Sequence, residues 1–130
     1  MQVATVRDNQ PWIASVYFAT DINLNLYWIS RAGRRHSQDI AQNSKVGGAI
    51  CLPHNYGQKV RGLQFEGTAR QLTEKDAEQG FMIFRQRFWI VDEASGNAND
   101  ASYCYQLQPS LYVLFDEINF PDNPRQELKI

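Results

Sequence analysis

The chain has 130 residues, a length that favours a single domain. Apolar residues make up 43% of it, charged residues 21%, and its mean hydropathy is −0.48, which together exclude a disordered chain. The sequence contains no apolar stretch long enough for a membrane helix, and residues 1–20 lack a signal-peptide pattern. We therefore expect one domain over residues 1–130, a cytoplasmic location and no membrane partner.

The charge is balanced overall but unevenly distributed along the chain. The net charge of −1 creates no field that would attract nucleic acid, so no nucleic-acid partner is expected. Residues 1–70 nevertheless carry eight Lys and Arg against four Asp and Glu, and Arg31, Arg34 and Arg35 form the densest basic cluster. Cys51 and Cys104 are far apart and show no metal-ligand spacing, so they are predicted to be free buried thiols.

The first part of the chain alternates with period two between turn residues, which predicts short strands. These strands are expected at residues 3–6, 12–20 and 24–30. In the second and third of them both alternating faces are largely apolar, whereas a half-solvated antiparallel strand shows one polar face. Something must therefore cover the second face: a barrel interior together with a helix, a partner subunit, or a flat ligand.

Two helices interrupt the strand pattern. Residues 33–43 suit a short helix, and Phe81, Phe84 and Phe88 recur at helical spacing within an amphipathic helix over 74–88, which a capping box at Thr73 would open. Further strands are predicted at 46–52, 59–72, 103–108 and 111–118, with a break at Pro109, a surface loop at 92–102 and a polar tail at 119–130. This order predicts an all-β fold with inserted helices, a six- or seven-stranded antiparallel split β-barrel.

A candidate phosphate site lies between the third strand and the first helix, where residues 30–36 read Ser-Arg-Ala-Gly-Arg-Arg-His. Free N–H groups at a helix N-terminus, a hydroxyl group and guanidinium groups together hold a phosphate well. Arginines at a helix N-terminus oppose the helix dipole, which favours an anionic ligand there. The alternative is a solvated basic turn that pairs with surface acids, and His36 is either a phosphate donor or an ordinary surface side chain.

A second candidate segment is residues 61–67, Arg-Gly-Leu-Gln-Phe-Glu-Gly. In a strand, Gln64 would either pair its amide with the edge of a planar heterocycle or face water. Trp12, Trp28 and Trp89 are candidates to wall a flat ligand. The sequence contains no hydrolytic, zinc or nucleotide-loop motif, so we predict no metal ligand and name no catalytic residue.

Taken in order, these motifs resemble the pyridoxamine 5′-phosphate oxidase-like, FMN-binding split-barrel superfamily. The ordered set consists of Asn-Gln-Pro-Trp at 9–12, Leu-Tyr-Trp-Ile-Ser at 26–30, Gly-Arg-Arg-His at 33–36, Asn-Ser-Lys-Val at 43–46 and the segment at 61–67. The resemblance covers about residues 2–72, and the remainder matches by layout. It implies a homodimer with one FMN in each of two clefts between the subunits.

The resemblance also implies a set of cofactor contacts. Ser15 and Val16 would lie along the isoalloxazine ring, and Ile29 and Ser30 would meet the phosphate end. Arg35 and His36 would bind the phosphate, His36 standing where many members of the superfamily have lysine. The remaining expected contacts are Arg61 or Gln64 at the ring or ribityl chain, and Trp89 of the partner subunit.

The implied function is FMN binding, with the protein acting as a flavin-dependent oxidoreductase by hydride transfer on an unidentified small molecule. A non-enzymatic flavin carrier or sensor would share the same site and remains an alternative. A haem-binding split barrel with His36 or His54 as axial ligand is a second alternative. The Arg-Leu-x-Pro-like ending of true pyridoxamine phosphate oxidases is absent, so vitamin B6 oxidation is not expected.

Overall fold

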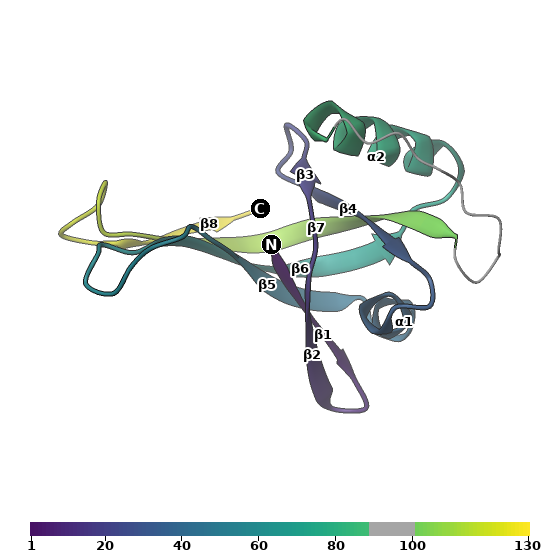
Figure 1. The fold of residues 1–130 in the computed structure, drawn as a ribbon, viewed down its shortest axis with the longest axis horizontal. Coiled ribbons are helices and arrows are strands. Elements are labelled where there is room, and N and C mark those ends of the chain that lie inside the picture. Colours follow the sequence, from purple (N-terminus) through teal and green to yellow (C-terminus); the bar gives the residue numbers. More distant parts are fainter. Residues whose placement is uncertain (89–100) are drawn as a thin grey trace.

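The computed structural model describes residues 1–88 and 101–130, which form a curled antiparallel sheet with two helices (Figure 1). The strands are β1 (Gln2–Arg7), β2 (Gln10–Ser15), β3 (Ala19–Thr20), β4 (Leu26–Arg31), β5 (Lys45–Cys51), β6 (Arg61–Gln71), β7 (Ser102–Asp116) and β8 (Arg125–Lys129), and the helices are α1 (Arg35–Gln42) and α2 (Glu74–Arg87). The sheet order is β2-β1-β5-β6-β7-β4-β3, and β8 pairs with β7. The predicted all-β split-barrel class with inserted helices is confirmed.

Eight strands are present in the described residues, against the six or seven expected. The predicted strand over 12–20 is divided into β2 and β3 by residues 16–18. The segment 119–130, expected as a polar tail, contains β8, which extends the outer edge of β7 beyond β4. The division of one predicted strand and the presence of β8 each add a strand. The two predicted C-terminal strands form the single strand β7, which removes one.

The predicted break at Pro109 is wrong, because β7 runs continuously past this proline. The register with the partner strand β6 shifts between Glu66 and Gly67, where the pairing skips Ser110 of β7, and this shift brings Gly67 opposite Pro109. A Cβ atom on Gly67 would lie 2.1 Å from the Gln108 carbonyl oxygen, so only glycine permits this close approach. The bulge therefore accommodates a residue that cannot donate a ladder hydrogen bond.

The core explains why β4 is apolar on both faces. Leu26 and Trp28 point into the barrel, where the Trp28 ring stacks on Tyr105 with centroids 5.5 Å apart. Tyr27 points to the opposite face and packs with Leu72 under α2. The helix α2 lies along β3, β4 and β7, whereas α1 packs near β1 and β6 (Figure 1). The second face of β4 is thus covered by a helix.

Helix α2 begins after Thr73, as expected, but the Thr73 side chain makes no capping hydrogen bond, so the predicted capping box is wrong. The larger part of the predicted 92–102 loop and Trp89 lie outside the described residues. Within the described residues no helix is both long and apolar enough to cross a membrane. The same residues contain no group of three or more His, Cys, Asp or Glu side chains placed to hold a metal ion.

Both cysteines are free thiols, but their environments differ. Cys104 is completely buried under α2, and this burial raises the pKa of its thiol to about 12. Cys51 lies at the end of β5 and is exposed, so the predicted burial of Cys51 is wrong. Residue 51 is the last of its strand, and hydrophobicity alone does not show where a strand leaves the core.

The difference between the two thiols predicts selective reactivity. At about pH 8 a thiol with a pKa near 12 is ionised to only about one part in 10⁴, and Cys104 is shielded as well. We expect Ellman's reagent to titrate one thiol per chain in the native protein and two in denaturant, with Cys51→Ser abolishing the native reaction. Rapid reaction of both thiols without denaturant would show that α2 does not protect Cys104.

Candidate anion-binding cleft

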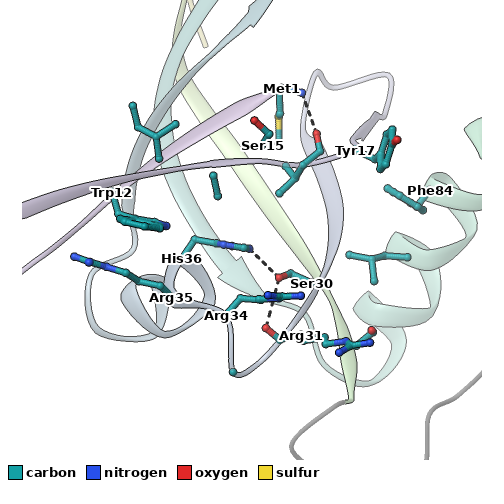
Figure 2. Close-up of a pocket in the computed structure, with 16 residues that line it drawn as sticks. Met1, Trp12, Ser15, Tyr17, Ser30, Arg31, Arg34, Arg35, His36 and Phe84 are labelled. Carbon is teal, nitrogen blue, oxygen red and sulfur yellow. Dashed lines mark hydrogen bonds between the residues drawn. The ribbon is translucent and has the colours of Figure 1, made fainter.

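A cleft of about 1100 Å³ lies between β2, the end of β4, the start of α1 and the inner side of α2 (Figure 2). Six residues expected from the sequence to contact a cofactor line it: Ser15, Val16, Ile29, Ser30, Arg35 and His36. They come from the end of β2 and the residue after it, from β4 and from α1, so the fold brings together residues that are separated in the sequence. Their contact with a cofactor stays a prediction.

The two ends of the cleft differ in chemistry. Arg34, Arg35 and His36 gather at the α1 end, whereas Tyr17 and Phe84 lie at the α2 end (Figure 2). None of the described residues that line the cleft is acidic. The cleft therefore has one cationic end and one aromatic end, an arrangement that would orient a ligand with an anionic group and a flat apolar part.

The N-terminus of α1 opens into the cationic end. Arg34 occupies the N-cap position, makes no side-chain capping hydrogen bond, and no acidic residue lies in the first helical turn. The first backbone N–H groups of a helix have no intrahelical partner and carry the positive end of the helix dipole. These groups are available to an anion, which would also relieve the repulsion between the dipole and the adjacent guanidinium groups.

Arg35 is fixed from two sides. Its guanidinium carbon lies 4.6 Å from the centre of the Trp12 ring, and its Nε lies 3.7 Å from Asp39 Oδ2. The second distance is within ion-pair range but too long for a hydrogen bond, so the buried Nε makes no hydrogen bond within the described residues. The stacking and the ion pair hold the guanidinium group beside Trp12 at the margin of the cleft (Figure 2).

Asp39 is the carboxylate that organises this end, and sequence reasoning missed it. It is completely buried on the inner side of α1, where Thr5 Oγ1 donates to its Oδ2 at 2.9 Å and Arg7 Nε lies 3.1 Å from its Oδ1. The two β1 side chains therefore attach α1 to the sheet. The spacing of four residues between Arg35 and Asp39 is the sequence signal that could have identified the ion pair.

His36 faces Ser30 rather than open solvent. Its Nε2 lies 2.8 Å from Ser30 Oγ, and Ser37 Oγ donates to the same oxygen at 3.1 Å. Burial and the nearby positive charge of Arg34 lower the pKa of the His36 ring, and the Asp39 carboxylate partly opposes this. The ring is therefore neutral at neutral pH.

Two residues of the expected set lie away from the cleft, and a third falls outside the described residues. Arg61 stands at the beginning of β6 opposite Asp116, and Gln64 is exposed in the same strand opposite Ala49 and Val113; neither lines the cleft. Trp89 lies outside the described residues. Tyr17 and Phe84 were not expected at the site, because the sequence does not show which face of α2 meets β2.

The positions of His36 and His54 decide whether either histidine is placed to ligate a haem iron in the cleft. The His36 Nε2 is already occupied by Ser30, so axial ligation through this nitrogen would break the 2.8 Å contact. His54 is exposed in the β5–β6 turn, with Nδ1 3.3 Å from the Leu52 carbonyl oxygen, and does not line the cleft. The geometry therefore offers no preformed histidine ligand for haem in this cleft among the described side chains.

Together, the antiparallel split barrel and its polarised cleft define a split-barrel protein suited to an anionic ligand. The family model for pyridoxamine 5′-phosphate oxidase matches residues 1–105, so the chain belongs to this family. The resemblance inferred from the ordered motifs is thereby confirmed. The matched range contains every described residue of the cleft.

The chain is also similar to individual proteins, one by sequence and two by structure. It is 29% identical to a UPF0306 protein of Pasteurella multocida over 87 residues, which cover 66% of this chain and 58% of that relative. A haem-binding protein from Mycobacterium smegmatis shares its fold with a TM-score of 0.79 and 10% identity, over 98% of this chain and 51% of that one. A pyridoxamine 5′-phosphate oxidase-related, FMN-binding protein from Nostoc punctiforme has a TM-score of 0.65 and 14% identity, over 97% and 76% of the two chains.

The chain therefore spans between half and two thirds of the length of the Pasteurella and Mycobacterium proteins. The two solved structures are less than 25% identical to it and show the shared fold alone.

The buried carboxylate gives a stability prediction. Asp39→Asn would leave Arg7 and Arg35 without their counter-charge, and removing one member of a fully buried ion pair costs about 3–5 kcal/mol. Because both guanidinium groups are about a third exposed, we expect the free energy of unfolding to fall by a smaller amount, about 2–3 kcal/mol, in urea denaturation.

The matched control is Asp76→Asn, whose partner Arg70 lies 2.8 Å away in an exposed ion pair. This substitution should cost about 1 kcal/mol or less. Equal losses from the two substitutions would mean that Asp39 does not anchor α1.

Proposed function

We propose that this protein binds FMN in the cleft and acts as a flavin-dependent oxidoreductase on an unidentified small molecule. The observation that carries the proposal is the uncapped start of α1, which opens into a cleft lined by Arg34, Arg35 and Ser30 with no acid among its described lining residues. The FMN-binding relative from Nostoc punctiforme, which has the same fold, supports the choice of cofactor.

The residues present fit the two ends of FMN. A phosphomonoester carries nearly two negative charges, which Arg34, Arg35 and the α1 N–H groups would neutralise, with Ser30 supplying a hydroxyl. The flat ring would lie along Ser15 at the end of the edge strand β2 and along the side chain of Val16, whose backbone N–H and carbonyl oxygen are already paired with Met1. The volume of about 1100 Å³ is at the upper limit of ordinary ligand pockets, which leaves room for a second small molecule.

Bound FMN would supply the hydride-transfer chemistry, and the chain would position it. The cationic end would fix the phosphate, and the apolar side chains of Val16 and Ile29 would exclude water from the ring. No acidic side chain lines the cleft within residues 1–88 and 101–130, so none of the described carboxylates is placed to take part in the reaction. A flavin carrier would use the same contacts, and oxidation of reduced nicotinamide by the loaded protein separates an enzyme from a carrier.

We also propose that a second copy of the chain covers the open side of the cleft. Strand β2 is the edge of the sheet, and its flank exposes large apolar side chains: Trp12 is 43%, Ile13 64% and Tyr17 76% exposed. Apolar side chains concentrated beside a ligand cleft are typical of an interface. A homodimer would bury them and enclose a flavin in each of its two clefts.

The cofactor proposal is tested by titrating the apoprotein with FMN and following flavin fluorescence and absorption. We expect tight binding, and we expect Arg35→Ala to weaken it by about 1.5–3 kcal/mol, the contribution of a hydrogen bond to a charged group. Arg70→Ala is the matched control, because Arg70 pairs with Asp76 outside the cleft and its loss should leave the affinity unchanged.

A colourless protein that does not bind FMN would contradict the proposal. A Soret band on addition of haem would then favour the haem alternative. Equal affinities of the wild type and Arg35→Ala would place the phosphate elsewhere.

The dimer proposal predicts a sedimentation-equilibrium mass of two chains. Ile13→Asp should shift the equilibrium toward the monomer, because it places a charge in the proposed interface. Met82→Asp is a control of similar size on α2, where Met82 is 57% exposed and outside the cleft. A monomeric wild type at micromolar concentration would contradict the dimer.

A further inference from the structure

We propose that His36 acts on the FMN phosphate through Ser30: His36 and Ser37 both donate to Ser30 Oγ, which forces the Ser30 hydroxyl to donate into the cleft toward a phosphate oxygen. This inference rests on the proposed FMN site. It makes His36 a positioning residue, whereas the sequence suggested that it binds the phosphate directly.

The geometry around Ser30 Oγ carries the inference. Two polar atoms contact this oxygen, His36 Nε2 at 2.8 Å and Ser37 Oγ at 3.1 Å. All three residues are at least nine-tenths buried, with exposures of 9% for Ser30, 8% for His36 and 4% for Ser37. Water therefore has little access to this cluster, and its hydrogen bonds must be arranged among its own members.

A hydroxyl group has two acceptor positions and a single proton. The Ser37 hydroxyl fills one acceptor position of Ser30 Oγ, and the His36 Nε2–H group would fill the other. Within the described residues, the acceptor that the Ser30 hydroxyl then reaches is the Arg31 carbonyl oxygen at 3.5 Å, which is at the limit of a hydrogen bond. A phosphate oxygen in the cleft would be a much stronger acceptor for the same proton.

The charges around the ring favour a neutral imidazole with a single N–H. Burial and Arg34 lower the pKa of His36, and Asp39, on the same helix, raises it. Arg31 from β4 and Arg35 from α1 line the same cleft. On the β7 side, burial raises the pKa of the Tyr105 phenol, which contacts Ser37, so this neighbour is uncharged.

The test measures affinities for FMN and for riboflavin, which lacks the phosphate, in a double-mutant cycle. Ser30→Ala should weaken FMN binding about tenfold or more and leave riboflavin binding within about twofold. His36→Leu should give a similar loss for FMN, and the double variant should be no worse than Ser30→Ala alone. His36→Gln, which keeps a neutral N–H donor, should restore most of the affinity.

The cycle separates the two roles of His36. If His36 contacts the phosphate directly, its removal will weaken FMN binding further in the Ser30→Ala background, and additive losses overturn the inference while leaving FMN binding intact. Equal weakening of FMN and riboflavin would also overturn it, because that result indicates a general structural effect. A wild type that binds no FMN would remove both the proposed function and this inference.

A second measurement does not depend on FMN. Nitrogen-15 NMR of the imidazole rings, with His54→Gln to assign them, reports which ring nitrogen carries the proton. We expect His36 to be protonated at Nε2 near neutral pH in the apoprotein. Protonation at Nδ1 alone would mean that Ser30 donates to His36, and the inference would be wrong.

Discussion

The buried carboxylate of Asp39 is the interaction on which the cleft depends. A charge that is completely removed from water must be compensated, and here Thr5 and Arg7 from β1 and Arg35 from α1 provide the compensation. Since these partners come from both elements, satisfying the charge also sets the position of α1 against the sheet. The same contact turns Arg35 toward Trp12 and directs the start of the helix into the cleft.

As a consequence, the described residues that line the cleft carry positive charges and no negative charge. Asp39 lies behind Arg35 rather than in the cleft, so the surface that a ligand would meet carries guanidinium groups and helix N–H groups without an acid among its described lining residues. At the opposite end Tyr17 and Phe84 provide aromatic surface. One end would select a ligand by charge and the other by shape, and the proposed flavin mononucleotide would satisfy both.

Some features of the fold and the cleft could be predicted from the sequence, and others could not. The Gly-Arg-Arg-His cluster and the strand order could be predicted because charge spacing and period-two alternation are local properties. The role of Asp39 could not, because the burial of one carboxylate depends on how α1 packs on β1. The continuity of β7 was missed for a similar reason: the close approach that tolerates Pro109 requires Gly67 on another strand, opposite the bulge at Ser110. Arg61 and Gln64 belong to a predicted site, yet their strand carries them away from the cleft of their own chain.

The surroundings of His36 determine what this side chain can contribute to an anion site. A lysine offers an exposed, strongly hydrated point charge, which attracts any anion and is weakened by salt. A neutral imidazole held at 2.8 Å from Ser30 contributes no such charge and can act by fixing a hydroxyl proton in one direction. Recognition of the phosphate would then rest on Arg34, Arg35 and the α1 N–H groups for charge, and on Ser30 for direction. Such a division of roles favours the geometry of a phosphate over that of anions in general, because a directed donor discriminates by the position of the acceptor oxygen.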